Sequence, residues 1–395
     1  MSRIVLYKGQ SQYDVLRIFI DQLAVAFSQQ LCKQVCIVDW LSPDITDQLN
    51  KAFSEPCEFV FAFNGVKGDL NANNKNLYET LDVPFIAALV DHPLYHLKRL
   101  ETISNNMIVT CVDRAHVTYL KERKYQQTMA FLPHGGSKWT GGNESDESKR
   151  EINVLFGGAY QSSNQFYETI AAFPKYVKKI LDEVIELTLW QNGISMEDAL
   201  NKVFKNHDIY LEPELSKKLN LLLHLVDQFI RARRREKVLE VLAKAGIVVD
   251  VYGNGWENAN WVSSMRIHPP VDFSSMLELM NKSKLVLNIG PNFSNGSHER
   301  VFSAMLNGAM AVTDNNLYFS SEFKSEEEIL LYNWSDIDVL PDKVAYYLSK
   351  PDQISAIAAK GRKKAETNHT WKNRAERILE IIEVYTSMKK ICYKD

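Results

Sequence analysis

Hydrophobic positions in the first third of the chain alternate between short continuous runs and segments with a helical period. Near Ser11 a helix is predicted, because apolar residues recur at i, i+3, i+4, i+7 and i+11 from Leu16 to Phe27. Continuous apolar runs are typical of strands buried on both faces of a parallel sheet. Such runs cover residues 3–7, 35–40, 58–64, 83–91, 107–113 and 128–134. This half of the chain therefore predicts a Rossmann-type layered structure of the α/β class.

The same alternation returns later in the chain, with a long helical stretch inside it. Residues from 165 to 245 contain no convincing strand and predict helices, and a final helix is predicted from Trp371 onward. Strand-like runs cover residues 152–156, 247–252, 265–268, 284–289 and 309–313. We therefore predict a second Rossmann-like domain that carries a helical segment.

A polar linker separates the two halves of the pattern. Residues 135–148 are rich in Gly, Ser and charged side chains and contain little that a core could bury. This division predicts an N-terminal domain of residues 1–145, a second domain of residues 146–370 with helical segment 165–245, and a C-terminal helix of residues 371–395. Because ligands of open α/β sheets bind beyond the carboxyl ends of strands, we expect functional residues at those ends.

Composition narrows the class of protein. Hydrophobic residues make up 45% and charged residues 24% of the 395 residues, as in a soluble globular protein. A net charge of −3 provides no global field towards nucleic acid or anionic lipid. There is no signal-peptide pattern and no apolar run near the roughly 18 residues of a membrane span. The five cysteines form no CxxC pair and fit reduced core thiols, so we expect a cytoplasmic protein. The sequence does not indicate an oligomeric state.

The clearest candidate site is the stretch NGSHERVFSAMLNGA at residues 295–309, which follows a predicted strand. A helix opened there by Ser297 or His298 would point free backbone N–H groups and a positive dipole end at a ligand, which suits a phosphate. Arg300 adds a guanidinium whose forked donors match phosphate oxygens. In the simpler alternative Ser297 is an ordinary N-cap, which leaves His298 and Arg300 unexplained.

Two carboxylate or hydroxyl side chains extend this candidate site along the helix. Glu299 and Ser303 lie four residues apart on one helix face, where they could accept hydrogen bonds from sugar hydroxyls. In the simpler alternative Glu299 only complements the helix dipole.

Two glycine turns at strand ends are weaker candidates for the same site. In residues 252–256 two glycines would let the backbone approach a ligand, and Trp256 could stack on a base; a tight turn with a packed Trp is the alternative. Residues 157–160, with Gly157, Gly158 and Tyr160, follow another strand. Neither turn matches a dinucleotide or P-loop fingerprint.

The predicted strand 83–91 of the first domain ends in Asp91 and His92. A carboxylate beside an imidazole can act as a general base or orient an acceptor hydroxyl. Alternatively, Asp91 caps the next helix and His92 packs. The basic run 229–237 lies in a predicted helix and is expected to be a solvated face rather than a localisation or nucleic-acid signal. Some of its arginines could alternatively reach the phosphates of a ligand. His, Cys, Asp and Glu residues do not have metal-ligand spacing, so we expect no metal.

Taken together, these motifs resemble those of the CgeB-like (spore maturation type) glycosyltransferases. The resemblance is strongest at residues 297–309 and at Val312-Thr313-Asp314. Supporting stretches are residues 155–158, 251–256, 268–271 and 369–375, with 89–93 and 132–136 in the first domain. It implies a GT-B fold: two Rossmann-like doubly wound domains facing across a cleft, with the acceptor in the first and a nucleotide-sugar donor in the second. It also implies that no metal is required and that the final helix packs back towards the first domain.

The resemblance assigns roles to individual residues. The donor diphosphate would be held by Asn295, Gly296, Ser297, His298, Glu299 and Arg300. Gly157, Gly158 and Tyr160 are also expected to bind the donor, and Tyr252, Gly253, Gly255 and Trp256 would border the base. Many relatives have Glu where this chain has Ser303, and that carboxylate is expected to hold the donor ribose. Glu299 could take over this role, which is a hypothesis.

The sequence therefore predicts a hexosyltransferase-like enzyme that moves a sugar from a nucleotide-diphosphate donor to a glycan or protein acceptor. Asp91 or His92 would activate or orient the acceptor. Two alternatives stay open: a nucleotide-sugar epimerase or hydrolase on the same fold, and a nucleotide-sugar-binding scaffold without catalysis.

Overall fold

The computed structural model describes residues 2–392 except 73, 102, 103, 105, 143–149, 211, 260, 262 and 263. The chain forms two compact units, one of Met1–Ser137 with Thr367–Asp395 and one of Lys138–Glu366. Each unit contains one six-stranded sheet. The predicted boundary between residues 145 and 146 lies outside the described residues.

The sheet of the first unit has the strand order β2-β1-β3-β6-β7-β8, and its strands run parallel. All residues of the central strands β6 and β7 are buried, as their continuous apolar sequences predicted. The strands are β1 (Arg3–Lys8), β2 (Gln34–Asp39), β3 (Cys57–Phe63), β6 (Phe85–Leu89), β7 (Met107–Cys111) and β8 (Thr128–Phe131). A small hairpin, β4 (Asn71–Ala72) and β5 (Lys75–Asn76), was not predicted.

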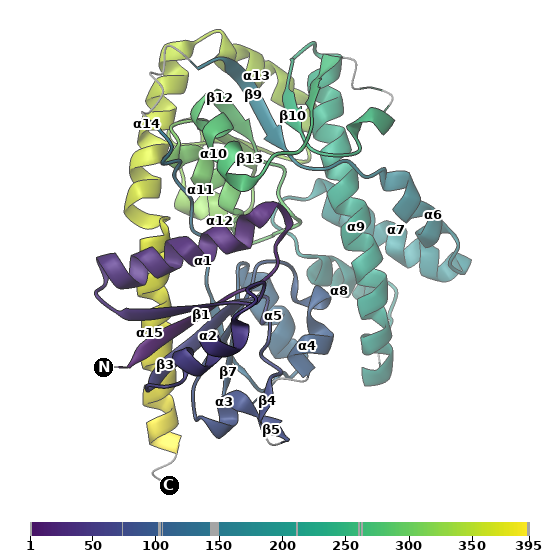
Figure 1. Cartoon of the computed structure of the whole chain (residues 1–395). Coiled ribbons are helices and arrows are strands. Elements are labelled where there is room, and N and C mark those ends of the chain that lie inside the picture. Colours follow the sequence, from purple (N-terminus) through teal and green to yellow (C-terminus); the bar gives the residue numbers. More distant parts are fainter. Residues whose placement is uncertain are drawn as a thin grey trace. The chain divides into compact units, whose positions relative to one another are not determined.

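The helices of the first unit come from both ends of the chain. They are α1 (Val15–Val25), α2 (Ile45–Ala52), α3 (Leu77–Thr80), α4 (Leu97–Glu101), α5 (Arg114–Glu122) and α15 (Trp371–Cys392). The C-terminal helix α15, yellow in Figure 1, packs against α1. The Trp371 ring lies 4.6 Å from that of Phe19, between their centroids. The last helix of the chain therefore completes the core of the first unit.

The segment that precedes α15 is held by residues 134–137. The backbone N–H of Gly136 donates to the His369 carbonyl at 2.7 Å, and Arg374 Nε donates to the His134 carbonyl at 2.8 Å. A Cβ on Gly135 would lie 2.7 Å from the Trp371 ring, so this ring requires a glycine beneath it. The residues of the 369–375 motif thus anchor α15 to the first sheet.

The sheet of the second unit has the order β11-β10-β9-β12-β13-β14, again with parallel strands. The strands are β9 (Ile152–Gly157), β10 (Asp250–Tyr252), β11 (Arg266–His268), β12 (Ser283–Leu287), β13 (Met310–Asp314) and β14 (Leu330–Tyr332). This is the order of a Rossmann sheet, in which the direction of strand addition reverses between β9 and β12. The strand β14 was not predicted.

A group of four helices, α6 to α9, lies between β9 and β10 in the chain and confirms the predicted helical segment (Figure 1). They are α6 (Ser163–Ala171), α7 (Lys175–Trp190), α8 (Met196–Asn206) and α9 (Pro213–Lys244). The C-terminal half of α9 packs on the sheet core through Val238, Leu239 and Leu242. The other helices of this unit are α10 (Phe273–Asn281), α11 (Glu299–Leu306), α12 (Leu317–Glu322), α13 (Leu340–Leu348) and α14 (Pro351–Asn368), whose last two residues belong to the first unit.

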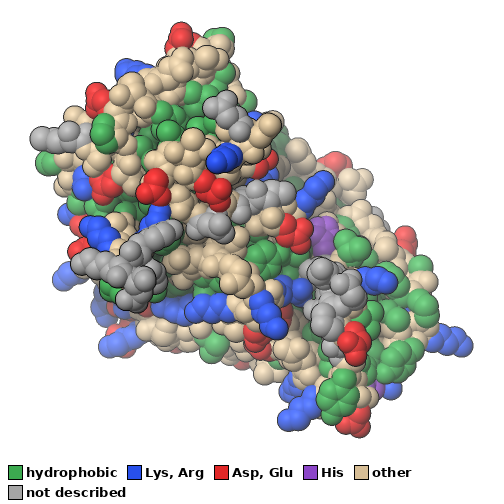
Figure 2. Space-filling view, turned by 90° about the horizontal axis from the view of Figure 1, so that it is seen from below, with side chains coloured by type: hydrophobic (Ala, Val, Ile, Leu, Met, Phe, Trp, Pro, Cys, Tyr) green, Lys and Arg blue, Asp and Glu red, His purple; other side chains and the backbone are tan. Residues whose placement is uncertain are grey.

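The surface agrees with the nearly balanced charge of the chain. On the face seen in Figure 2, acidic and basic side chains are interspersed, and hydrophobic side chains are exposed in small groups. Within the described part of the chain, no helix combines the length and hydropathy needed to cross a bilayer.

Candidate functional site

The candidate donor site lies in the second unit, at the carboxyl ends of β9 and β12. The strand order reverses between these two neighbouring strands, which is where open α/β sheets bind their ligands. Gly157 ends β9 and Gly158 follows it, while residues 288–298 form the connection from β12 to α11. The fold therefore brings together two stretches that the sequence predicted as parts of one site.

The N-terminus of α11 is a candidate site for a hydrogen-bond acceptor of a ligand. His298 occupies the N-cap position with φ −109° and ψ 137°, and no side-chain cap is seen among the described residues. Ser297 is fully buried and is not the N-cap, so the simpler alternative for Ser297 is wrong. Backbone N–H groups at this positive end of the helix can bind an anion.

His298 lies between two acceptor oxygens. Its Nδ1 is 2.9 Å from Asn288 Oδ1, and its Nε2 is 3.1 Å from Glu299 Oε2. Asn288 Nδ2 in turn donates to Thr313 Oγ1 at 2.9 Å. An imidazole can place one ring nitrogen at each of these oxygens, and a protonated ring nitrogen donates to the oxygen that it faces. His298 thus holds the Glu299 carboxylate at the start of α11.

Two arginines from different elements converge near Gly158. Arg235 of α9 donates from Nη1 to the Ala159 carbonyl, and its Cζ lies 3.8 Å from the position that a Cβ on Gly158 would occupy. The partly buried Arg300 of α11 has its guanidinium 5.7 Å from the centroid of the Phe156 ring. Burial, followed by the positive charges of Arg231 and Arg300, lowers the pKa of Arg235. These guanidinium groups therefore reinforce one another's positive potential.

Neither Arg235 nor Arg300 forms an ion pair with any described residue. In addition, Arg234 Nε, Arg235 Nε and Asn292 Nδ2 are buried without a hydrogen-bond partner in the described structure. All three atoms are donors, and buried donors are normally satisfied. A ligand rich in anionic oxygens would satisfy them and would neutralise the arginines.

Arg234 and Arg235 were not predicted as site residues, and the expected solvated face at 229–237 is wrong for Arg234. Arg234 is 5% exposed, donates from Nη1 to Asn292 Oδ1 at 3.1 Å, and lies over the Trp334 ring at 4.6 Å. A signal was available, because Arg234 is four residues from both Ile230 and Val238 on the apolar stripe of α9.

The glycines of residues 253–256 have a different role from the predicted one. With φ +159°, Gly253 would place a Cβ 2.2 Å from the Gly158 carbonyl oxygen, and Gly255 with φ +88° would place one 2.7 Å from the Tyr160 oxygen. Trp256 is fully buried and donates from Nε1 to the Gly158 carbonyl at 2.8 Å. These residues press two backbone segments together, and in this conformation Trp256 has no exposed face on which a base could stack.

Two predicted tyrosines keep partly exposed rings. Tyr252 stacks on His268 with centroids 4.3 Å apart and an interplanar angle of 10°. The Tyr160 hydroxyl lies 3.4 Å from Glu236 Oε1, and its ring lies 5.2 Å from Trp256. Gly157 supports this region, because a Cβ there would lie 2.8 Å from Met276 Cε. Contact of either tyrosine with a donor stays a prediction.

Hydrogen bonds from Asn316 hold the rest of the predicted donor loop. Asn316 Nδ2 donates to the Phe293 and Gly296 carbonyls at 3.2 and 3.0 Å. Asn295 is partly exposed, whereas Ser303 is fully buried within α11. The Glu299 side chain retains 11% exposure. Of the two residues considered for the ribose, both are buried, and Glu299 is the one whose side chain keeps some exposed surface.

The predicted catalytic pair belongs to the first unit. His92 is buried, and its Nδ1 accepts the Leu94 N–H at 3.2 Å, which caps the short 3₁₀ helix Pro93–Tyr95. Its ring packs on His116 and Tyr119, with centroids 4.3 and 5.0 Å away. The alternative in which His92 packs therefore describes the structure, and His92 rather than Asp91 is the cap.

Asp91 is partly exposed and acts electrostatically on His96. Burial lowers the pKa of His96 to about 4, and the Asp91 charge opposes this shift. A catalytic role for Asp91 stays a prediction. Among the described residues, no group of three or more His, Cys, Asp and Glu side chains is arranged to hold a metal ion.

Comparison with known proteins gives one match to a family model. Residues 233–380 match a family model described as glycosyl transferase-like, and this stretch includes Arg234, Arg235 and Arg300. A search of curated proteins finds no match.

Solved structures resemble nearly the whole chain. Sucrose-phosphate synthase from Thermosynechococcus elongatus has a TM-score of 0.56 at 9% identity, over 98% of this chain and 100% of that chain. An alpha-glucosyltransferase in complex with UDP-glucose and DNA containing an abasic site has a TM-score of 0.55 at 13% identity, over 96% and 99%. HepE of Anabaena in complex with UDP-glucose has a TM-score of 0.52 at 9% identity, over 97% and 100%.

At these identities the likeness shows the fold, which is that of the GT-B glycosyltransferases. The predicted fold class is confirmed by the two parallel six-stranded sheets and their surrounding helices. Membership of the CgeB-like subfamily stays a prediction.

Proposed function

We propose that the chain is a glycosyltransferase that transfers a sugar from a nucleotide-diphosphate donor to a glycan or protein acceptor. One observation carries this proposal. Arg235 and Arg300 lie without ion pairs at the switch point between β9 and β12, beside buried donors that have no described acceptor. The match of residues 233–380 to a glycosyl transferase-like family model supports it.

A diphosphate explains the cluster of donors better than a neutral ligand does. Guanidinium groups bind phosphate oxygens with two parallel N–H donors, and a helix N-terminus adds backbone donors. When the bond to the sugar breaks, negative charge develops on the departing diphosphate. Groups already positioned around that charge stabilise the transition state. In this proposal Arg235, Arg300 and the start of α11 neutralise the leaving group, and no metal is required.

UDP is the first nucleotide to test, because similar folds have been solved with UDP or UDP-glucose. Isothermal titration with UDP, GDP, dTDP, CDP and their common sugar conjugates, in EDTA, would measure the affinities. Arg300→Ala and Arg235→Ala should each lower the affinity for the nucleotide about 10- to 100-fold, the loss expected for one charge-assisted hydrogen bond. Arg233→Ala is the matched control, since Arg233 lies on the same helix and pairs with Glu236.

The outcomes separate the possible functions. Failure of every nucleotide to bind, or equal affinity in the three variants, would contradict the proposed site. Consumption of the sugar donor without an acceptor would instead favour a hydrolase or epimerase. Donor binding without turnover across glycan and protein acceptors would favour a scaffold.

A further inference from the structure

The resemblance includes Val312-Thr313-Asp314, at the end of β13, without assigning a role to these residues. Thr313 is fully buried and Asp314 is 6% exposed. Asn288, which follows the neighbouring strand β12, is buried as well. Buried polar side chains are normally hydrogen-bonded, so their partners indicate what these three residues do.

Hydrogen bonds join these residues to His298 in a continuous chain. Thr313 Oγ1 donates to Asp314 Oδ1 at 3.3 Å. Asn288 Nδ2 donates to Thr313 Oγ1 at 2.9 Å, and Asn288 Oδ1 lies 2.9 Å from His298 Nδ1. On the other side of the ring, His298 Nε2 lies 3.1 Å from Glu299 Oε2. The chain therefore runs from the end of β13 to the first turn of α11.

The carboxylate at one end gives this chain a direction. A carboxylate only accepts, so the Thr313 hydroxyl donates its one hydrogen to Asp314 and accepts from Asn288. The Asn288 amide then turns Nδ2 towards Thr313 and Oδ1 towards His298. Because an amide oxygen only accepts, Nδ1 of His298 carries a hydrogen. In the opposite direction the amide would be flipped and Nδ1 would be the acceptor.

The surroundings of Asp314 act on its charge in opposite directions. Burial raises the pKa of Asp314, and the positive charge of Arg234 and the N–H of Gly290 oppose this rise. Arg234 is itself only 5% exposed, so its charge is weakly screened by solvent and favours the carboxylate form. Asp314 can thus serve as the accepting end of the chain.

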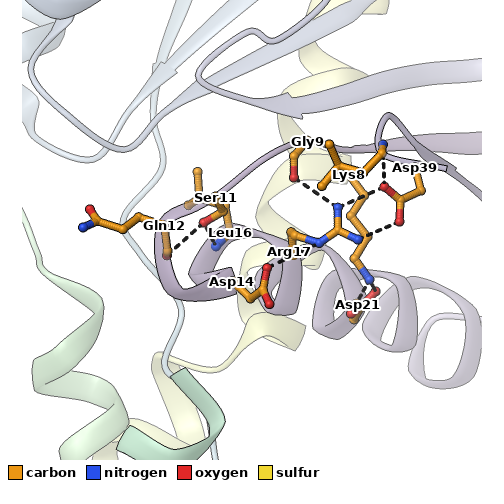
Figure 3. Close-up of polar contacts among 10 residues, drawn as sticks. Lys8, Gly9, Ser11, Gln12, Asp14, Leu16, Arg17, Asp21 and Asp39 are labelled. Atoms are coloured by element: carbon orange, nitrogen blue, oxygen red, sulfur yellow. Dashed lines mark hydrogen bonds and ion pairs between the residues drawn. The ribbon is translucent and has the colours of Figure 1, made fainter. Parts of the chain in front are cut away.

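A carboxylate of the first unit shows a contrasting arrangement. Asp39, at the end of β2, accepts from Nη1 and Nη2 of Arg17 at 2.9 and 2.7 Å (Figure 3). In that pair one guanidinium binds both oxygens. Arg234 donates instead to Asn292 Oδ1 at 3.1 Å, which leaves Asp314 Oδ1 to the hydroxyl that begins the chain.

We propose that Asn288 and Thr313 are positioning residues of the donor site, which keep a hydrogen on Nδ1 of His298 and so make Nε2 the nitrogen whose proton binds the Glu299 carboxylate. An Nε2 without a proton would face that carboxylate with its lone pair, so one proton lies between the two groups. This proton holds Glu299 at the start of α11, where the donor is expected. The inference rests on the proposed function.

The protonation of the His298 ring can be measured without a ligand. Proton–nitrogen NMR of the full chain with isotope-labelled histidine distinguishes a ring protonated at Nδ1, at Nε2 or at both, and His298→Gln identifies the signals. Thr313→Val keeps the shape of the side chain and removes the hydroxyl, whereas Thr313→Ser keeps the hydroxyl and removes a methyl group. Thr188→Val is the matched control, since the buried Thr188 hydroxyl donates to the Val184 carbonyl within α7 at 2.8 Å.

We expect Nδ1 of His298 to be protonated in the wild type, in Thr313→Ser and in the control, and both tautomers to be present in Thr313→Val. UDP affinity should fall about fivefold in Thr313→Val, because Glu299 loses a fixed donor, and by less than about twofold in Thr313→Ser and in the control. A purely structural role of Thr313 would leave the ring signals unchanged in both of its variants.

An Nδ1 without a hydrogen in the wild type, or the same ring protonation in Thr313→Val and Thr313→Ser, would overturn the proposal. Equal UDP affinity of these two variants would show that the chain does not position the donor site. Failure of UDP to bind the wild type would contradict the proposed donor site instead, and the ring signals would still decide how His298 is protonated.

Discussion

Replacing Gly253 by alanine tests how the two backbone segments of the donor site are joined. The new Cβ would lie 2.2 Å from the Gly158 carbonyl oxygen, where real Cβ contacts stay above 3.0 Å. The segments would therefore have to separate by at least 0.8 Å, the difference between these two distances. Because the Cβ position is fixed by its own backbone and its partner is a backbone oxygen, a side-chain rotation cannot relieve the clash.

The cost follows from the bonds that span the two segments. Gly158 N–H donates to the Tyr252 carbonyl, Tyr160 N–H to the Asn254 carbonyl, and Trp256 Nε1 to the Gly158 carbonyl, each at 2.8 Å. Three hydrogen bonds at about 1 kcal/mol each and about 1–3 kcal/mol for the forced shift give about 4–6 kcal/mol. At roughly 2–4 °C per kcal/mol for a unit of this size, Tm should fall by about 8–24 °C.

Gly246→Ala is the matched control. Gly246 has φ +72°, but no described atom lies within 4 Å of its Cβ position, so only the left-handed conformation is penalised. That penalty is about 1–2 kcal/mol. Differential scanning calorimetry and UDP titration should show a much larger loss of stability in Gly253→Ala, and weaker UDP binding in that variant alone. Equal losses of stability in the two variants would refute the steric argument.

Three further predictions concern other parts of the molecule. Trp371→Ala should lower the free energy of unfolding, measured in urea, by about 3–5 kcal/mol, because the ring is buried against α1. The control Val384→Ala, at an exposed position of the same helix, should change it by less than about 0.5 kcal/mol. Similar effects of the two substitutions would show that α15 is not part of the core. The hydrogen bond from Arg17 lowers the pKa of Asp39, so its stabilising effect is present above the ordinary value of 3.8 and lost as the pH falls through the lowered pKa. Urea unfolding from pH 6 to pH 3 should therefore show a steeper loss of stability in the wild type than in Asp39→Asn, and parallel curves would contradict this pairing. Glu299→Gln should lower the affinity for UDP about tenfold, as expected for a lost charge-assisted hydrogen bond, and should lower the affinity for 2′-deoxy-UDP less. An equal loss of affinity for both nucleotides would exclude contact with the ribose 2′-hydroxyl.

The predicted strands could be read from the sequence because their apolar runs are continuous. A strand that is buried on both faces can be recognised from its own continuous apolar run, as β6 and β7 show. The strand β14 was missed although all three of its residues, Leu330–Tyr332, are buried, because so short an apolar run does not by itself distinguish a strand from a helix or a packed turn. The three-residue strands β10 and β11 were found because longer strand-like runs include them.

The candidate site was predictable only in part. Arg300 and the loop before α11 stood out because charged residues begin an otherwise apolar helix. The run 229–237 was predicted to be a solvated basic face. All its arginines carry the same charge, so charge alone does not indicate which of them the helix buries. Arg234 is buried because α9 packs on the sheet and on Trp334. The same packing places Arg235 beside Gly158.

By itself, the sequence determined the order of strands and helices, the parallel sheets they imply and the turns at the strand ends. These properties depend on periodicity and on turn residues, which act over a few neighbouring positions. Tertiary structure alone decided that Gly253 and Gly255 lie against another backbone segment. Trp256 and Gly158 are 98 positions apart, and Arg235 and Ala159 are 76 apart. Contacts over such separations exist only after the sheet has formed, because the strand order places these residues side by side.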